Sequence, residues 1–312
     1  MKRRRVMMEE YHKPVMLTES VDGLDIKPDG IYIDVTFGGG GHSKSILSQL
    51  SPDGRLFAFD RDPDAAANAL DDDRFELIAQ DFKFLKNYLR FFRISQVDGI
   101  LADLGVSSHQ FNEGERGFSI RFDGPLDMRM DQKSLLTAAK VVNEYEEEDL
   151  SNLLFQYGEL RNSRKIAQLI AKQRAEQPIG TIADLKKAIQ SVTPWGKENR
   201  FLAQVFQALR IEVNGELESL KGLLEQSEEL LRPEGRLSVI TYHSLEDRLV
   251  KNYMQKGKFS GEVEKDFFGN KLTPFEQVNR KPIVPTEEEL NDNNRARSAK
   301  LRVAKRIVNE SV

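Results

Sequence analysis

The chain contains no cysteine, a single tryptophan and only four histidines among its 312 residues. The absence of cysteine excludes disulfides, thiolate metal ligands and catalysis by a cysteine nucleophile. We expect no metal site, because the four dispersed histidines do not match the spacing of a metal-binding motif. A chain without disulfides suits a reducing compartment, so we expect a cytoplasmic protein.

Long apolar segments are also absent. No run approaches the roughly 20 residues that span a bilayer. The basic start at 2–5 leads into Glu9 and Glu10 rather than into the apolar stretch of a signal peptide. We therefore expect no membrane partner. Hydrophobic residues make up 39% and charged residues 31% of the chain, a balance typical of globular proteins. The net charge of −4 disfavours general binding to nucleic acid but permits a local basic patch.

Short apolar segments alternate with helical ones at both ends of the chain. Strands are predicted at 31–35, 55–59, 75–79, 98–103 and 236–241, with helices between them, including one over 215–231. Pro233–Gly235 is expected to turn the chain, and 299–303 to form a strand with one exposed face. Strands that alternate with helices indicate a parallel sheet covered on both faces. The predicted fold class is therefore α/β, with a doubly wound sheet.

A helical insert interrupts this alternation after residue 113. Apolar residues recur at helical spacing in four segments between about 135 and 212, and 114–130 resembles a loop. The acidic run at 146–149 is expected to begin a helix, where negative charge complements the dipole. We predict two domains: 1–113 with 213–312, which binds the cofactor, and the helical insert 114–212.

The glycine-rich turn at 38–41 follows the first strand and precedes a helix. Such a turn lets a ligand approach the backbone and presents free N–H groups at a helix start. Asp60 ends the next strand, about 20 residues on, where a carboxylate can accept from both ribose hydroxyls. Gly38, Gly40, Gly41 and Asp60 therefore predict a nucleoside site at the carboxyl ends of the strands.

The same turn discriminates between two nucleoside cofactors. The dinucleotide motif requires a third glycine, but Ser43 stands at that position. Asp34 at the end of the first strand would repel a pyrophosphate and would suit the ammonium group of a methionine moiety. These residues favour S-adenosylmethionine over NAD, although a nicotinamide-dependent oxidoreductase stays an alternative on this architecture.

Many long motifs, in a single order, carry a resemblance that spans nearly the whole chain. They are YHKPVML at 11–17, DVTFGGGGHS at 34–43, DLGVSS at 103–108, RGFS at 116–119, DGPLDMRMD at 123–131, FQALRIEVN at 206–214, HSLEDR at 243–248 and RARSAKLRVAKR at 295–306. On these motifs the chain resembles the bacterial family of 16S ribosomal RNA cytidine N4-methyltransferases, the small-subunit RNA methyltransferase H type. One segment departs from the family pattern: 194–205 reads PWGKENRFLAQV, where a histidine-proline pair is common.

The resemblance implies a class I S-adenosylmethionine-dependent methyltransferase sheet with an inserted helical domain. It implies methylation of N4 of one cytidine in the decoding region of 16S ribosomal RNA. We expect this RNA as the partner within the small subunit, although the sequence leaves both naked RNA and a homodimer open. The cofactor residues that it implies are Gly40, Gly41, His42, Asp60, Phe82, Asp103 and Gln110. The motif around Phe82 matches only loosely, so Phe84 is an alternative for that role.

Catalytic candidates lie where the fourth and fifth strands end. Amino-methyltransferases commonly carry D/N-P-P-Y/F after the fourth strand, but this chain has DLGVSS. Asp103 is the polar candidate to accept from the target amine, unless cofactor binding occupies it. Tyr242 and His243 are candidates for contact with the base, with strand-end packing as the alternative.

Basic side chains predict where RNA would bind. The candidates are Arg116, Arg121, Arg129, Arg164, Arg297 and Arg302. Arginine neutralises phosphates without requiring a basic protein. A solvated face, or lysines that protect a sheet edge, is the alternative for each residue. A noncatalytic RNA-binding scaffold that retains the cofactor fold is the remaining rival function.

Overall fold

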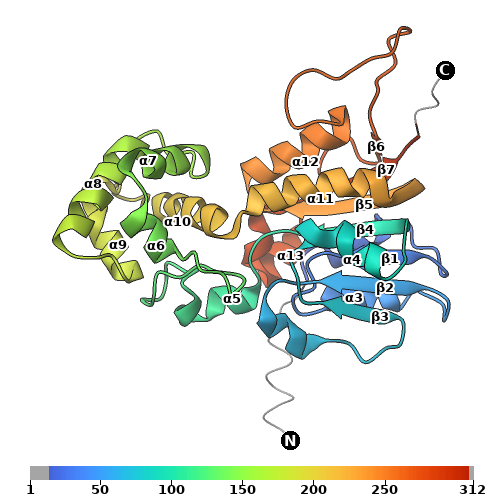
Figure 1. Cartoon of the computed structure of the whole chain (residues 1–312), viewed down its shortest axis with the longest axis horizontal. Coiled ribbons are helices and arrows are strands. Elements are labelled where there is room, and N and C mark those ends of the chain that lie inside the picture. The colour runs from blue at the N-terminus through green and yellow to red at the C-terminus, as the bar shows by residue number, and fades with distance from the viewer. Residues whose placement is uncertain (1–13, 309–312) are drawn as a thin grey trace, which may run out of the picture. The chain divides into compact units, whose positions relative to one another are not determined.

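The computed structural model describes residues 14–308 and divides the chain into two compact units (Figure 1). The first comprises the chain up to Gly105 together with the chain from Leu217 onward. The second is Val106–Glu216. Among residues 14–308, no helix combines the length and apolar character that crossing a membrane requires.

A seven-stranded sheet forms the centre of the first unit, in the order β3-β2-β1-β4-β5-β7-β6. Within the part of the sheet formed by β1 to β5, all neighbouring strands run parallel, whereas β7 is antiparallel to both β5 and β6. The strands are β1 (Ile31–Asp34), β2 (Arg55–Phe59), β3 (Phe75–Ile78), β4 (Val97–Asp103), β5 (Leu231–Thr241), β6 (Phe275–Gln277) and β7 (Lys300–Arg306). The predicted parallel sheet is confirmed, and the antiparallel β7 beside β5 departs from the dinucleotide-binding order.

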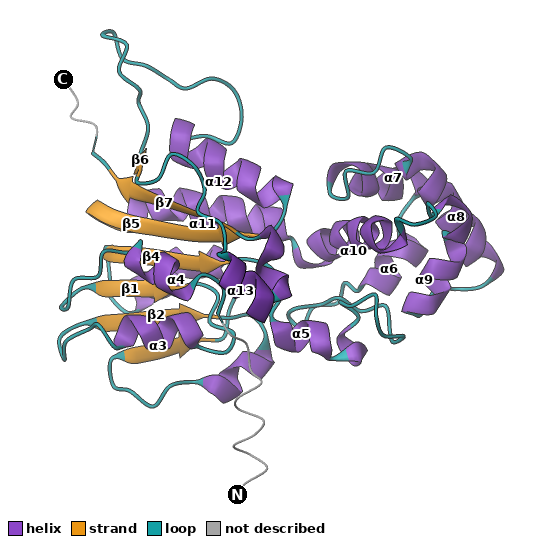
Figure 2. Ribbon diagram, turned by 180° about the vertical axis from the view of Figure 1, so that it is seen from behind, coloured by secondary structure: helices purple, strands orange, loops and turns teal. Residues whose placement is uncertain are grey.

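Helices cover both faces of this sheet because its strands are apolar on both sides (Figure 2). Apolar residues of α4 (Leu85–Phe91), α11 (Glu216–Leu230) and α12 (Ser244–Lys256) pack on one face, around Phe57 and Ile100. Residues of α2 (Leu17–Asp22) and α3 (Gly41–Leu47) pack on the other, around Tyr32 and Leu101. The remaining short elements are α13 (Glu287–Asp292) and the 3-10 turns η1 (Pro63–Asn68), η2 (Phe82–Phe84) and η5 (Asn294–Ser298).

Two strands differ from the sequence-based expectation. β5 begins at Leu231, and the expected turn at Pro233–Gly235 lies within it as an irregularity: Val97 pairs with Leu231, but Gly99 pairs with Arg236. β7 was expected to have one exposed face, yet Leu301 to Ala304 are all buried. Its second face is covered because Asp247 of α12 pairs with the buried Arg302.

The second unit is helical and has its own apolar core. Its helices are α5 (Ser108–Asn112), α6 (Ala138–Glu144), α7 (Glu147–Gln156), α8 (Ser163–Glu176), α9 (Ile182–Ala188) and α10 (Glu198–Asn214), with 3-10 turns η3 (Gly114–Arg116) and η4 (Gln190–Val192). Fully buried Leu150, Ile166, Leu185 and Val205 belong to one cluster, so each predicted helical face points inward. Three acidic residues occupy the first turn of α7, as expected.

Candidate active site

The sheet reverses its strand order between β1 and β4, and such switch points form crevices at the carboxyl ends of the strands. Asp34 ends β1 and Asp103 ends β4. Asp60 directly follows β2, and Tyr242 directly follows β5. Four polar side chains from four neighbouring strands thus meet at one edge of the sheet, as the sequence analysis expected.

The glycines of the turn at 38–41 are required for different physical reasons. Gly38 and Gly40 adopt φ angles of 50° and 74°, a region that other residues enter at a cost. A Cβ on Gly40 would lie 2.9 Å from the Phe37 ring, and one on Gly41 would lie 2.7 Å from the Pro14 ring. A Cβ on Gly38 would meet only a backbone oxygen at 4.0 Å. Gly40 and Gly41 therefore serve internal packing, whereas the space beside Gly38 is open to a ligand.

Asp60 braces this turn and keeps capacity for a ligand. Its Oδ2 accepts from the Gly38 N–H at 2.8 Å, and its Oδ1 accepts from the Asp62 N–H at 2.8 Å. Asn68 holds the other side of the turn by donating to the Gly38 carbonyl at 3.0 Å. Each carboxylate oxygen retains a second acceptor position. Burial raises the pKa of Asp60 to about 6, against the opposing effect of these N–H donors.

Asp34 does not fit its expected role of binding an ammonium group. Its side chain is completely buried. It accepts from the Ser43 hydroxyl at 2.7 Å and from the Thr36 N–H at 3.1 Å. Burial raises the pKa of Asp34 despite these bonds. Asp34 thus ties the end of β1 to α3 and cannot touch a ligand without rearrangement.

Asp103, Tyr242 and His42 form a cluster at the ends of β4 and β5. The Tyr242 hydroxyl donates to Asp103 Oδ1 at 2.6 Å, and Thr36 Oγ1 accepts from the Asp103 N–H at 2.7 Å. Burial raises the pKa of Asp103 to about 6, although His42 and Tyr242 act in the opposite direction. Burial, followed by the nearby charge of Asp103, raises the pKa of Tyr242 well above its usual value, so the phenol stays protonated.

The tautomer of His42 follows from its second partner. Its Nε2 lies 3.2 Å from the Val15 carbonyl, which can only accept, so the proton is on Nε2. Burial lowers the pKa of His42, which keeps the ring neutral near pH 7. Its Nδ1 is then an acceptor, 3.9 Å from Asp103 Oδ2. Two facing acceptors favour a donor group, such as an amine, beside them.

His243 has a structural role, and its contact with a base stays a prediction. It is the N-cap of α12, and its Nδ1 accepts from the Glu246 N–H at 3.4 Å. Glu246 returns the interaction by accepting from the Tyr242 and His243 N–H groups. The motif HSLEDR therefore encodes a capping box that fixes where Tyr242 lies. Tyr242 remains the aromatic candidate.

Phe82 and Gln110 also take part in local structure. Phe82 lies in η2 and packs partly buried against the core beside α4, whereas Phe84 is 40% exposed. Gln110 forms a capping box with Ser107 at the start of α5, and its side chain is buried. Their roles toward a cofactor stay predictions.

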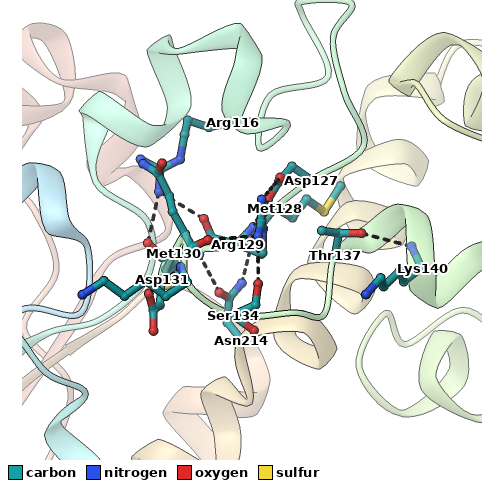
Figure 3. A network of polar contacts seen from close by, with 12 residues as sticks. Arg116, Asp127, Met128, Arg129, Met130, Asp131, Ser134, Thr137, Lys140 and Asn214 are labelled. Carbon is teal, nitrogen blue, oxygen red and sulfur yellow. Dashed lines mark hydrogen bonds and ion pairs between the residues drawn. The ribbon is translucent and has the colours of Figure 1, made fainter.

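Two of the proposed RNA-binding arginines hold the insert together (Figure 3). Arg129 pairs with Asp127 through two bonds of 2.9 and 2.7 Å and also donates to the Ser134 carbonyl. Arg116 donates to the carbonyls of Arg129 and Met130. The same loop is fixed from α10 by Asn214, whose amide bonds to the backbone of Met128 and Met130. The motifs RGFS, DGPLDMRMD and FQALRIEVN thus encode one internal network.

Arg302 is a further correction to the RNA-binding set. Its side chain is 5% exposed, and its Nε donates to Asp247 Oδ1 at 2.7 Å. Burial would raise the pKa of Asp247, but the hydrogen bond and charge of Arg302, with Lys300, lower it. Arg121, Arg164 and Arg297 are exposed and stay in the predicted set.

Three further residues take part in the site without having been predicted from the sequence: Thr36, Ser43 and Asn68. Thr36 and Ser43 stand within the motif DVTFGGGGHS, and both bind Asp34. Short polar residues within reach of a strand-end carboxylate could have signalled that Asp34 is internally satisfied. Asn68 lies 30 residues from Gly38, and no local pattern connects them.

Comparison with known proteins identifies the family. Residues 9–307 match the family model of the MraW methylase family. The chain is 58% identical over 302 residues to ribosomal RNA small subunit methyltransferase H of Christiangramia forsetii, covering 97% of this chain and 100% of the relative. It is 60% identical over 298 residues to the protein of the same name from Flavobacterium johnsoniae, covering 96% and 98%. The chain belongs to the MraW methylase family.

This membership confirms the resemblance, the methyltransferase fold class and the enzyme class predicted from the sequence, with S-adenosylmethionine as cofactor. The observed residues fit that cofactor. Asp60 offers acceptor positions for ribose hydroxyls beside the open face of Gly38. NAD, the competing cofactor, is disfavoured because the chain lacks the third glycine of the dinucleotide motif. In addition, the strand beside β5 is the antiparallel β7, where the dinucleotide-binding fold has a parallel strand.

Proposed function

We propose that this chain methylates the exocyclic N4 of a cytidine in the decoding region of 16S ribosomal RNA, with S-adenosylmethionine as methyl donor. The names of the relatives support ribosomal RNA of the small subunit as the substrate. The observation that carries the reaction is the pair of acceptors, Asp103 Oδ2 and His42 Nδ1, that face each other at the switch point. An amino group is a donor of the kind that this pair accommodates.

The chemistry asks little of the protein. Bound S-adenosylmethionine supplies a methyl group activated on a sulfonium. Cytosine N4 is a weak nucleophile because its lone pair is conjugated with the ring. Asp103 accepts from one N4–H, which localises that lone pair on nitrogen, and then takes the proton that methylation releases. With a pKa of about 6, the Asp103 carboxylate is ionised at neutral pH and can do so. Tyr242 fixes its orientation through Oδ1, which leaves Oδ2 for the substrate.

The helical insert supplies the proposed RNA-recognition domain, 114–212. A cytidine in folded RNA must leave its stack before its amine can react, and a separate domain can hold the flanking strand meanwhile. Arg121 and Arg164 are exposed on this unit, and Arg297 is exposed on the other. We assign phosphate contacts to these three residues. We place the reaction in the cytoplasm, on RNA within the small subunit.

The test is to map N4-methylcytidine in ribosomal RNA from cells with and without this protein, and again with Asp103→Asn. We expect the modification to disappear in both cases, with the variant still binding S-adenosylmethionine. A protein that binds RNA while the modification persists in its absence would support the scaffold hypothesis. Calorimetric binding of NAD in preference to S-adenosylmethionine would support the oxidoreductase.

A further inference from the structure

The segment between α12 and β6 presents two phenylalanines to solvent. Phe267 is 98% exposed and Phe268 is 75% exposed, and their rings are perpendicular with centroids 5.8 Å apart. They lie within a hairpin of residues 264–272, here called the Phe hairpin, in the long loop between α12 and β6 that extends from the sheet unit (Figures 1 and 2). Two large apolar side chains that are exposed side by side form an apolar patch, and such patches mark interaction sites.

The turn that carries these rings is internally braced. The Asp266 N–H donates to the Asn270 carbonyl at 2.9 Å. The Asp266 carboxylate accepts from the Asn270 side chain at 2.8 Å, from the Asn270 N–H at 2.8 Å and from the Phe268 N–H at 2.9 Å. The Asn270 side chain, followed by these backbone donors, lowers the pKa of Asp266. The negative charge of Asp266 is therefore stabilised by hydrogen-bond donors of the turn itself. Exposed rings on a braced turn lose little conformational entropy when they bind a partner.

Two lysines flank the rings at the base of the turn. Lys265 and Lys271 are paired directly across the hairpin in an antiparallel bridge, and both are exposed. Like charges at opposed positions destabilise a strand pair. Within residues 14–308 neither lysine has a carboxylate partner, whereas the nearby Lys258 pairs with Glu264 at 3.0 Å. An anionic partner would relieve this repulsion.

The far end of the loop is attached to the sheet. Thr273 and Pro274 are buried, and the Pro274 carbonyl accepts from the Ile307 N–H at 3.0 Å just beyond β7. At the near end, Pro274 packs so closely on Gly257 that a Cβ there would lie 2.7 Å from its ring. The rings are thus carried by an element with both ends anchored.

We propose that the Phe hairpin is an RNA-binding element, in which Phe267 and Phe268 stack on unpaired bases while Lys265 and Lys271 contact the adjoining phosphates. This inference rests on the proposed function, because it takes ribosomal RNA as the partner. Single-stranded RNA combines both required chemistries: every base has a face for stacking, and every linkage carries a negative charge. A protein partner would satisfy the rings but needs a separate acidic patch for the lysines.

The experiment measures binding of the full-length chain to a transcript of small-subunit ribosomal RNA at several salt concentrations. Loss of base stacking in Phe267→Ala/Phe268→Ala should weaken binding by roughly 10- to 100-fold. Lys265→Ser/Lys271→Ser should reduce the slope of log Kd against log salt by about one to two units. Affinity for S-adenosylmethionine should not change in either variant.

Matched controls come from the same unit. Phe91→Ala removes a phenylalanine that is 78% exposed on α4, and Lys221→Ser/Lys251→Ser removes two lysines from α11 and α12. Neither control should alter RNA affinity or its salt slope. Far-ultraviolet circular dichroism, with cofactor calorimetry on the same samples, verifies that each variant is folded.

The outcomes separate this inference from the proposed function. If the wild type methylates the transcript and the hairpin variants bind it as the wild type does, the inference is wrong and the proposed function stands. If the variants bind the transcript normally but lose activity only on assembled subunits, the partner is a ribosomal protein and the inference is again wrong. If the wild type neither binds nor methylates ribosomal RNA, either as the transcript or within assembled small subunits, both fail.

Discussion

The Tyr242 hydroxyl donates a 2.6 Å hydrogen bond to Oδ1 of Asp103 and so joins the ends of β5 and β4. Gly105 permits this contact, because it adopts a φ of 99° and a Cβ there would lie 3.3 Å from the Tyr242 ring. The bond orients the one carboxylate to which we assign proton acceptance. Tyr242 is thus a positioning residue, and its effect should be visible in the pH profile.

Tyr242→Phe should preserve the ring and lose this bond. A hydrogen bond to a charged group contributes about 1.5–3 kcal/mol, so we expect kcat to fall roughly 10- to 100-fold. The pKa of Asp103 should rise further, which moves the acidic limb of the kcat profile to higher pH. Calorimetry should give nearly unchanged affinity for S-adenosylmethionine. If that affinity falls by the same factor as kcat, the pair holds the cofactor and not the amine.

The raised pKa values of Asp60 and Asp103, both about 6, predict two acidic limbs with different readouts. Protonation of Asp103 removes the acceptor, so kcat should fall as the pH drops below about 6. Protonation of Asp60 weakens ribose binding, so the Kd for S-adenosylmethionine should rise over the same range. Asp103→Asn should abolish activity and leave the limb in Kd unchanged, whereas Asp60→Asn should abolish the limb in Kd and leave the limb in kcat. A kcat that is flat from pH 5 to pH 8 would contradict the assignment of Asp103.

The same raised values carry a stability consequence of known sign. Because the folded protein binds these protons more tightly than the unfolded chain does, stability is greatest below about pH 4 for this contribution and is lost as the pH rises through 6. At pH 8, Asp103→Asn should therefore stabilise the cofactor-free protein, by about 1–3 kcal/mol. Urea unfolding of both proteins at pH 5 and pH 8 measures this difference.

Gly38 and Gly40, the two glycines of the turn with positive φ, should respond differently to substitution. Gly40→Ala places a methyl group 2.9 Å from the Phe37 ring in a left-handed conformation, so we expect a loss of stability of about 2–4 kcal/mol. Gly38→Ala meets no side chain and should lose only about 1–2 kcal/mol from its backbone. Its larger effect should be on the Kd for S-adenosylmethionine, which calorimetry measures. Equal affinity in the wild type and Gly38→Ala would show that no ligand approaches this face.

Arg302→Ala should destabilise the protein rather than change its salt dependence toward RNA. The substitution leaves Asp247 without its closest partner in a largely buried position, which costs about 2–4 kcal/mol. Arg297→Ala, at an exposed position of η5, is the matched control and should change stability by less than about 0.5 kcal/mol. Thermal unfolding compares the two. Equal melting temperatures for both variants would mean that the pair contributes nothing.

Trp195 reports on RNA binding without a label, because it is the only tryptophan and is 96% exposed. It lies in the insert beside exposed Lys197 and Arg200. If the insert recognises RNA, a ribosomal RNA transcript should quench its fluorescence, and Trp195→Ala should weaken binding by about 1–3 kcal/mol. Unchanged emission at saturating RNA would place Trp195 away from the interface.

The strands could be predicted because their apolar runs reflect burial on both faces. The same reasoning failed where a polar residue is buried by a distant segment. Arg302 has the spacing of an exposed strand residue, and only the packing of α12 supplies Asp247. The turn residues at Pro233–Gly235 predicted an end to secondary structure, but β5 absorbs them as an irregularity.

At the site, the residue types predicted that the polar side chains lie at the carboxyl ends of the strands, but they did not predict which residue has which role. Asp34, Asp60 and Asp103 all end or follow a strand, so the sequence presents them as equivalent acids. Their roles differ because Asp34 is completely buried and bound by Ser43 and Thr36, whereas Asp103 keeps one oxygen at 3.9 Å from His42. The sequence similarly predicts Arg116 and Arg129 as RNA ligands, since charge alone does not reveal a bond to a backbone carbonyl.

The interruption of the sheet unit by the insert has a consequence for synthesis on the ribosome. β4 pairs with β5, yet the whole insert is translated between them. At a translation rate of about 5–20 residues per second, one edge of β4 therefore stays unpaired for roughly 6–25 seconds before β5 is synthesised. The insert, with its own core, can fold during that interval. We expect the nascent chain to be most prone to aggregation then, because β4 is a strand that is buried along nearly its whole length in the folded protein, and its edge is still unpaired.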